Sequence, residues 1–200
     1  MKDLGLKCMV RPKKYRSYKG DVGEPAPNIL DRQFQATEAN EKWVTDLTEF
    51  KLFSKKYYLS PVLDLFNGEI ISWTIGNRPT YSLVSDMLDK AFKCLAKGDK
   101  PLMHSDQGWH YRMKQYRYTL KQKGIRQSMS RKGNCYDNAV IENFFGIIKS
   151  EFIFHENFKD EQHFLQELES YINYYNEERI KEKLDGMSPV EYRTHYQQTA

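Results

Sequence analysis

The sequence predicts an α/β fold in which a mixed sheet of five strands is flanked by helices. Two β-rich runs, at 56–66 and 69–76, are joined by Asn67-Gly68, which is a strong hairpin signal. Beyond them, apolar residues recur at helical spacing within 82–98 and 160–178, and short β-rich runs separate the helical stretches. Three strands followed by alternating helices and strands are typical of a mixed sheet.

The first three strands are expected to form an antiparallel meander. The first of them, 43–53, alternates in polarity and is rich in β-forming residues. Pro61 inside the second run indicates an edge or a bulge, because proline cannot donate a ladder hydrogen bond. Two shorter strands complete the expected sheet, at 101–106 and 125–130.

The helices are expected on the evidence of their apolar spacing and their end signals. They are placed at 82–98, 111–124, from about 138 onward, 160–178 and, as a short helix begun by a proline, within 186–196. The third of these helices has an apolar stripe that is expected to lie in the core, made of Ile141, Phe144, Phe145, Ile148 and Phe152.

Composition excludes several classes of protein. With 200 residues, of which 40% are hydrophobic, the chain is long enough to form a core. No apolar run approaches the ~20 residues of a membrane span. The three cysteines are far apart and show no zinc-ligand spacing, so a reduced, cytosolic setting is expected.

The net charge of +4 is distributed unevenly along the chain. Residues 1–20 contain seven basic residues and one acidic residue, and 112–132 contain eight basic residues and no acid. Two separate basic blocks suggest a polyanionic partner that touches defined places. A solvated surface explains either block equally well when it is taken alone.

Three carboxylates are placed where the predicted strands and helices would bring them together. Asp46 lies within the first strand, Asp106 ends the fourth, and Glu142 lies in the first turns of the helix that begins near residue 138. The first and fourth strands of such a sheet are commonly neighbours at its centre. Converging carboxylates repel one another unless a cation is present, and oxygen ligands suit Mg²⁺ or Mn²⁺. Two such ions ~3.5–4 Å apart can support an in-line phosphoryl displacement.

The flank of the helix after residue 138 offers a second reason to consider Glu142. Glu142, Gly146 and Lys149 lie on one side of this helix, next to its core stripe. Gly146 leaves room for a nucleic-acid backbone, and Lys149 is placed to contact a phosphate. Spacing alone also allows a surface glutamate beside a surface lysine, and this alternative stays open.

Four further residues near the predicted site have two interpretations each. His104 shares the strand face of Asp106, so it either orients a ligand or is a satisfied structural histidine. Asp64 either reaches the metal site or caps the Asn-Gly hairpin. Trp109 and Tyr111 either stack on a base or pack locally.

Phosphate contacts are expected from the basic helix 112–123 and from the basic stretch 11–19. Such contacts provide affinity and salt dependence without reading sequence. The candidate side chains are Arg112, Lys114, Arg117 and Lys121 in the helix and Lys13 and Lys14 in the N-terminal stretch.

Four segments carry a resemblance to a known family. They read KWVTDLTEF, HSDQGWHY, SRKGNCYDNAVIENFFGIIKSE and YNEERIKEKLDGMSPVEYR. Together with Asp46, Asp106 and Glu142, with 35 residues between the last two, they resemble the DDE integrase core of bacterial insertion-sequence transposases, in the retroviral integrase superfamily. The chain resembles the product of the second of two overlapping reading frames, over roughly residues 25–195.

The resemblance implies a ribonuclease-H-like fold and a specific chemistry. Asp46, Asp106 and Glu142 are then the catalytic residues and the ligands of two Mg²⁺ or Mn²⁺ ions. The expected activities are 3′-end cleavage of transposon ends and transfer of the freed 3′-hydroxyl to target DNA. Lys149 matches a position that contacts DNA.

The resemblance also indicates how the loop before Glu142 and the molecule as a whole would work. Residues 131–139 are expected to be a flexible active-site loop, in which Arg131, Lys132 and Asn138 contact DNA and Asp137 or Asn138 caps the following helix. A homo-oligomer assembled on DNA is expected, in the bacterial cytoplasm at the nucleoid, with no membrane partner.

The expected organisation has three parts. Residues 1–40 form a basic N-terminal arm or linker left from an upstream helix-turn-helix region, 41–157 the catalytic core, and 158–200 a helical extension. Two other functions compete with strand transfer. One is a catalytically silent DNA-binding remnant that modulates a full-length transposase, and the other is a ribonuclease-H-like nuclease that hydrolyses without joining.

Overall fold

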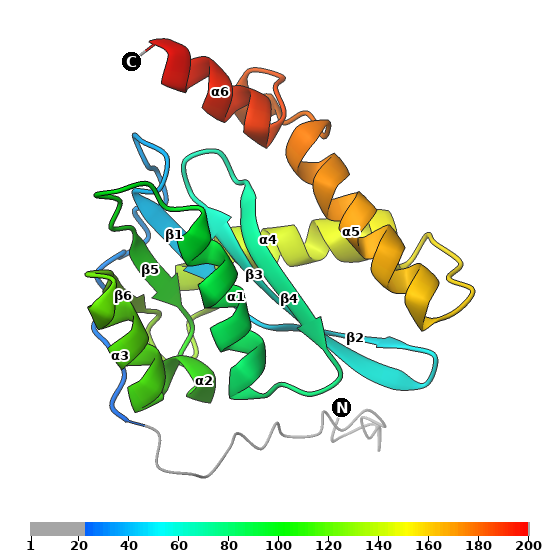
Figure 1. Ribbon diagram of the computed structural model, residues 1–200, viewed down its shortest axis with the longest axis horizontal. Coiled ribbons are helices and arrows are strands. Elements are labelled where there is room, and N and C mark those ends of the chain that lie inside the picture. Colours follow the sequence, from blue (N-terminus) through cyan, green and yellow to red (C-terminus); the bar gives the residue numbers. More distant parts are fainter. Residues whose placement is uncertain (1–22, 200) are drawn as a thin grey trace, which may run out of the picture.

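A mixed sheet with helices on both faces forms the centre of the molecule (Figure 1). This computed structural model describes residues 23–199, so Lys13 and Lys14 lie outside the described residues. The strands are β1 (Lys42–Thr45), β2 (Thr48–Leu52), β3 (Lys55–Asp64), β4 (Ile70–Gly76), β5 (Leu102–Ser105) and β6 (Arg126–Met129). The α-helices are α1 (Tyr81–Lys93), α2 (Trp109–Arg112), α3 (Lys114–Gln122), α4 (Ala139–Ile148), α5 (Glu161–Glu177) and α6 (Pro189–Thr199).

The strand order agrees with the predicted meander and with the predicted neighbours at the centre. β3 pairs antiparallel with β4 on one side and with both β1 and β2 on the other. β1 then pairs in parallel with β5, and β5 in parallel with β6. The sheet has five positions, as predicted, but six strands, because β1 and β2 are the two halves of the first predicted strand.

The interruption between β1 and β2 has a physical cause in the neighbouring strand. Thr45 pairs with Val62 and Thr48 with Leu59, so Asp46 and Leu47 lie opposite the segment that contains Pro61. Proline has no N–H to donate, and its carbonyl accepts a 2.8 Å hydrogen bond from the Thr45 hydroxyl. Asp46 was expected inside the strand, and it lies instead at the break that Pro61 causes.

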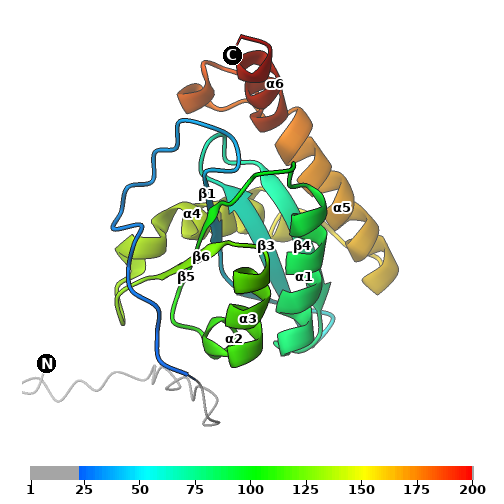
Figure 2. The same cartoon turned by 60° about the vertical axis from the view of Figure 1, so that its left-hand side comes forward.

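Two hydrophobic clusters hold helices to opposite faces of the sheet, as Figure 2 shows. One cluster joins α4 and α5 to the sheet, and the predicted stripe of α4 is buried in it, from Ile141 to Phe152. The other joins α1 and α3 to the opposite face around Trp43, Met87 and Tyr116. Because α5 shares a core with α4, the predicted boundary at residue 158 separates segments that pack together.

The helices follow the predicted ranges with two differences. The single helix expected over 111–124 is divided into α2 and α3 at Met113, which has an extended backbone. A 3-10 turn, η1 (Cys135–Asn138), precedes α4, and a π-helical turn, η2 (Lys149–Ile153), follows it. A further 3-10 turn, η3 (Glu182–Leu184), lies between α5 and α6. Within 23–199, no helix is both long and apolar enough to cross a membrane.

The described part of the expected N-terminal arm is packed against the core. Residues 23–40, which we call the strap, run along β6 on the outside of the sheet (Figure 2). The Ser128 hydroxyl accepts hydrogen bonds from the backbone N–H groups of Ile29 and Leu30, and Leu30 is buried. Residues 23–40 of the predicted arm or linker are therefore packed on the core, and residues 1–22 lie outside the described residues.

Candidate active site

Two aspartates follow the carboxyl ends of neighbouring parallel strands. β1 and β5 pair in register, with Val44 opposite His104 and Thr45 opposite Ser105. Asp46 and Asp106 are the next residues of their strands, so both leave the sheet at the same level. The carboxyl ends of parallel strands are a common place for functional groups in α/β folds. The strand order thus brings together the first two predicted site residues.

Short hydrogen bonds fix the two aspartate side chains after the strands end. Asp46 accepts a 2.7 Å bond from the N–H of Leu47, and Asp106 accepts a 2.7 Å bond from the N–H of Gly108. A Cβ atom at position 108 would lie 2.8 Å from the Asp106 carboxylate and 3.3 Å from the Tyr111 ring. Glycine at this position therefore leaves the space in which the Asp106 carboxylate sits.

Glu142 reaches the same end of the sheet from α4. It lies in the first turn of this helix and is exposed, while its neighbour Ile141 is buried. Gly146 is also exposed, and a Cβ there would have open space around it, as predicted. Lys149 lies farther along; the pKa of Glu49 on β2 is lowered mainly by a hydrogen bond from Lys56, and the charge of Lys149 adds to this effect.

The three carboxylates affect one another's protonation. Burial, together with the charges of Asp106 and Glu142, raises the pKa of Asp46 to about 8. Burial also raises the pKa of Asp106. The pKa of Glu142 is raised by its partial burial and by the charge of Asp106. The structure thus brings the predicted triad into electrostatic contact.

No cation of the described residues balances this negative charge. Among residues 23–199, no Lys, Arg or His forms an ion pair with any of the three carboxylates. The same residues contain no group of three acidic, histidine or cysteine side chains that is already close enough to hold a metal ion. The donor set suits a hard divalent cation, and Glu142 would have to approach the aspartates to join it.

The loop before Glu142 has a different internal structure from the one predicted. Asn138 occupies the position just before α4, but its side chain makes no capping hydrogen bond. The side chain is buried next to Asp46 and opposes the rise in the pKa of Asp46. Its amide lies close enough to Asp46 to lower the pKa of that carboxyl, although neither amide atom forms a hydrogen bond of good geometry within the described residues. Helix capping by Asn138 is therefore wrong.

Asp137 is the centre of an ion-pair cluster that the sequence did not reveal. Its buried carboxylate accepts two hydrogen bonds from the Arg131 guanidinium, at 2.8 and 2.9 Å, and one at 2.8 Å from Arg32 of the strap. The Arg131 N–H and the Asn28 amide add bonds of 3.0 and 3.2 Å. We call Asp137, Arg131, Arg32 and Asn28 the Asp137 clamp. The Asp137 carboxylate therefore joins the loop to the strap. Because its hydrogen bonds go to these partners, the prediction that Asp137 caps α4 is also wrong.

His104 and Asp64 both have structural partners. His104 is fully buried between the hydroxyls of Ser128, at 2.8 Å, and Ser130, at 3.3 Å. Burial lowers the pKa of His104 to about 4, so the ring is neutral at physiological pH. These contacts favour the structural interpretation of His104.

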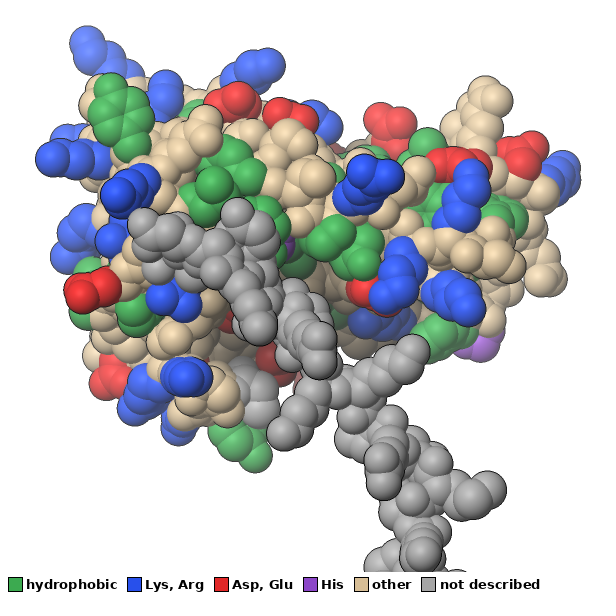
Figure 3. Space-filling model, turned by 90° about the horizontal axis from the view of Figure 1, so that it is seen from below, with side chains coloured by type: hydrophobic (Ala, Val, Ile, Leu, Met, Phe, Trp, Pro, Cys, Tyr) green, Lys and Arg blue, Asp and Glu red, His purple; other side chains and the backbone are tan. Residues whose placement is uncertain are grey.

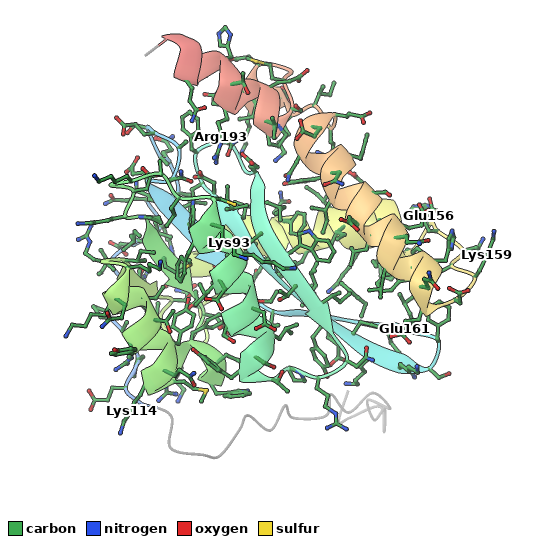
Figure 4. All side chains as sticks on the ribbon, viewed as in Figure 1. Lys93, Lys114, Glu156, Lys159, Glu161 and Arg193 are labelled. Atoms are coloured by element: carbon green, nitrogen blue, oxygen red, sulfur yellow. The ribbon has the colours of Figure 1, made fainter. Side chains whose placement is uncertain are left out.

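Asp64 lies at the opposite end of β1 from Asp46, opposite Trp43. Its carboxylate accepts bonds of 2.7 Å from Arg193 of α6, 2.8 Å from the Asn40 N–H and 3.0 Å from the Phe66 N–H in the hairpin loop. Arg193 points from α6 toward the sheet (Figure 4). A role of Asp64 near the metal is therefore wrong, and its place in the hairpin is confirmed.

The predicted DNA-contacting side chains differ in their exposure and in their contacts within the protein. Lys114 and Lys121 are exposed on α3, and Lys114 points away from the body of the molecule (Figure 4). Arg117 and Lys121 line a hollow of about 540 Å³ between α3 and the strap. Arg112 donates a 2.9 Å hydrogen bond to the Gly23 carbonyl. Seen from below, Lys and Arg side chains are numerous on the left, toward α3 (Figure 3).

The basic residues of the loop before α4 also differ in their contacts. Lys132 is exposed at the tip of the loop, whereas Arg131 is committed to Asp137 and also lies 3.5 Å from Asp31. Contacts of any of these side chains with DNA remain predictions.

Comparisons with known proteins agree with the fold and with the family that the sequence resembles. Residues 36–135 and 142–196 each match a family described as integrase core domain. The chain is 53% identical over 193 residues to the putative transposase InsK for insertion sequence element IS150 of Escherichia coli, covering 96% of this chain and 68% of that protein. It is 49% identical to an uncharacterized transposase-like protein of Haemophilus influenzae, covering 97% and 89%. The HTLV-2 integrase catalytic core in complex with magnesium has a similar fold, with a TM-score of 0.60 and 17% identity, covering 79% and 99%.

The fold is the ribonuclease-H-like fold, which the catalytic cores of retroviral integrases share. The class of enzyme is that of polynucleotidyl transferases. At this level of identity, the chain belongs to the integrase core family of bacterial insertion-sequence transposases, whose function is DNA transposition.

Proposed function

We propose that this chain cleaves transposon ends and joins their 3′-hydroxyls to target DNA, with Asp46, Asp106 and Glu142 as ligands of two Mg²⁺ or Mn²⁺ ions. The observation that carries this proposal is the pair Asp46–Asp106, which is partly buried, in register and without a cationic partner among residues 23–199. Such a pair is unfavourable by itself, and a divalent cation removes the repulsion.

Each carboxylate has a distinct part in this proposal. When bound, the cations activate the attacking oxygen and stabilise the leaving oxygen of an in-line displacement. Asp46 and Asp106 form the fixed half of the site, because their strands are hydrogen-bonded to each other. Glu142 forms the movable half. The buried apolar stripe of α4 packs on the sheet and keeps Glu142 close to the two aspartates. No histidine base is needed, in agreement with the structural role of His104.

DNA is the proposed partner, as transposon end and as target. We assign the catalytic core to residues 41–157, with 158–200 as an extension packed on it. The proposed DNA contacts are Lys149, Lys132, Asn138, Lys114, Arg117 and Lys121, with Arg112, Arg131, Lys13 and Lys14 as further candidates. Transposition acts on two ends together, so we propose a homo-oligomer on DNA, at the nucleoid of the bacterial cytoplasm.

A joining assay tests the proposal. The chain is incubated with Mn²⁺, target DNA and pre-cleaved duplex from the ends of its own insertion sequence, beside an Asp106→Asn control. We expect joined products with the unaltered chain and none with the variant. Cleavage without joining would favour a ribonuclease-H-like nuclease, and binding with neither product would favour a silent DNA-binding remnant.

Salt dependence tests the basic contacts separately from the chemistry. Each phosphate contact that is neutralised by Lys or Arg releases counterions, so affinity for nonspecific duplex should fall steeply between 50 and 200 mM salt, by ~10³-fold for about six contacts. The measurement is a titration by fluorescence anisotropy. A flat response would contradict the use of the basic segments as DNA contacts.

A further inference from the structure

Tyr136 is a large aromatic side chain left in solvent beside the candidate active site. Its residue is 69% exposed, whereas its neighbours Asp137 and Asn138 are 0% and 2% exposed. All three belong to the 3-10 turn η1, which directs Asp137 and Asn138 inward and Tyr136 outward. Asn138 lies next to Asp46, so the Tyr136 backbone is only two residues from the acidic site.

The Asp137 clamp holds the surroundings of Tyr136 in place. Arg32 donates to Asp137 at 2.8 Å, and its guanidinium carbon lies 5.8 Å from the centre of the Tyr136 ring. That distance is within the range of a cation–π contact. The Asp137 carboxylate therefore holds both the backbone next to Tyr136 and the Arg32 guanidinium beside the Tyr136 ring.

An exposed but anchored ring of this kind has no partner in the core. A ring that only packs locally would lose most of its exposed surface, as Tyr111 does, which is 1% exposed. Base stacking by Tyr111 is accordingly wrong. Trp109 has its ring centre 3.8 Å from that of His110. Tyr118 is 63% exposed but belongs to α3, whereas the exposed ring of Tyr136 belongs to the turn that also contains Asn138, beside Asp46.

We propose that Tyr136 stacks on an unpaired nucleobase at the end of the DNA substrate, with Arg32 beside the neighbouring phosphate. This inference rests on the proposed function, which brings DNA ends to the acidic site. Bases inside a duplex have both faces covered by their neighbours, so a free face occurs only at the end of the DNA, where an unpaired base can also turn to meet the ring. Stacking of this type tolerates different bases and is worth ~1–3 kcal/mol per base.

A cycle of changes in protein and DNA tests the inference. The probe is a 20-base-pair duplex with a single-stranded tail of three adenines, compared with the same duplex whose tail is abasic. For the unaltered chain, we expect the abasic tail to weaken binding by about 5- to 150-fold, the equivalent of stacking one base. For Tyr136→Ala, both probes should bind with the weaker affinity, so the two changes are not additive.

Two control variants separate stacking from loss of structure. Tyr136→Phe keeps the ring and should keep the preference for the adenine tail. Tyr174→Ala removes a tyrosine that is 45% exposed on α5, and this variant should also keep the preference for the adenine tail. Tyr174 precedes Tyr175, whose hydroxyl accepts a hydrogen bond from Lys181 in the segment after α5. Circular dichroism melting of each variant checks that the fold is retained.

The outcomes distinguish this inference from the proposed function. If the unaltered chain does not prefer the adenine tail, or if Tyr136→Ala keeps the preference, the stacking role is overturned even when joined products form. If binding follows the expected cycle but no joined product forms with Mn²⁺, the proposed chemistry fails and the stacking role stands.

Discussion

Asp137 and the pair Asp46–Asp106 are carboxylates at the same end of the sheet. Asp137 has positively charged partners, whereas the pair has none among the described residues. Asp137 is fully buried and accepts hydrogen bonds from two arginines and an asparagine. These partners, Arg131 first among them, hold the pKa of Asp137 far below its usual range. Asp46 and Asp106 have no arginine or lysine partner within 23–199, and burial raises the pKa of each.

The difference separates a structural acid from acids that are free to bind a ligand. A buried charge with several hydrogen-bonded partners holds two segments in one arrangement, here the loop before α4 and the strap. A pair of acids without partners retains negative charge that only a protonation or a bound cation can relieve. Burial alone would not have distinguished the two cases, because the distinction lies in the partners.

The largest expected effect comes from neutralising one acid of the triad. Asp46→Asn should lower the rate of strand joining by at least about 10²–10³-fold, the range for removing one electrostatic stabiliser of a transition state. The folded protein should remain, since the variant removes a repulsion with Asp106. Single-turnover joining measures the rate. A fall in activity accompanied by unfolding would contradict this division of roles.

Neutralising the structural acid Asp137 should destabilise the fold. Asp137→Asn leaves Arg32 and Arg131 without their anion, and removal of one member of a buried ion pair costs about 3–5 kcal/mol. The two arginine side chains are 46% and 52% exposed, so water replaces part of the loss and we expect about 2–3 kcal/mol. For a chain of this length, this corresponds to a melting temperature lower by about 4–12 °C.

Arg131→Lys is the matched control for the Asp137 clamp. It keeps the positive charge but loses the paired hydrogen bonds to Asp137, at 2.8 and 2.9 Å, so its effect should be smaller than that of Asp137→Asn. The stabilising effect of Asp137 should also disappear as the pH falls below about 4, where the carboxyl of the unfolded chain takes up a proton. Equal melting temperatures for Asp137→Asn and the unaltered chain at pH 7 would show that the clamp does not stabilise the fold.

Local patterns predicted the positions of Glu142 and Asp106, because those positions follow from short stretches of sequence. The apolar stripe of α4 determines which side of the helix Glu142 lies on, and the β-rich run 101–106 ends at Asp106, whereas Asp46 was expected inside the run 43–53 and lies after the end of β1. The parallel pairing of β1 with β5 then brings the two aspartates to the same level. These features depend on periodicity, which a single sequence contains.

Partners that are distant in the sequence were beyond such reasoning. Asp137 meets Arg32 across 105 positions, and Asp64 meets Arg193 across 129. The break at Asp46 depends on Pro61 in the opposing strand, so it becomes visible only when the strand register is known. A buried acid with a charged partner can be located only in the folded structure, because neither burial nor partner follows from the local pattern.

A smaller effect is expected from adding a methyl group beside Asp106. Gly108→Ala introduces a Cβ 2.8 Å from the Asp106 carboxylate, and the backbone of Gly108 (φ −52°, ψ 143°) is accessible to alanine. The carboxylate therefore has to move, and we expect joining to slow by ~10-fold, as for other residues that orient metal ligands. Gly76→Ala at the end of β4 is the control, because its Cβ meets a methyl group of Leu83 at 3.3 Å and no carboxylate. Equal rates for the two variants would show that the position of the Asp106 carboxylate does not limit joining.

The smallest effect is a reversal in how pH changes the stability of the metal-free protein. In the unfolded chain Asp46 ionises near pH 4, whereas in the folded chain it keeps its proton to about pH 8. The folded state then binds more protons between these values, so the free energy of unfolding should fall as the pH rises from 4 to 8. The Asp46→Asn variant lacks this decline and should melt above the unaltered chain at pH 8, with no difference at pH 4. The full pKa shift is equivalent to ~5 kcal/mol, and because the side chain is only partly buried, solvent screening reduces the expected effect to about 1 kcal/mol, or about 2–4 °C. Mg²⁺ should stabilise the unaltered chain more at pH 8 than at pH 5, because binding requires ionised carboxylates. If the melting temperatures of the two proteins follow the same course with pH, Asp46 is ionised without a cation, and the contrast with Asp137 does not hold.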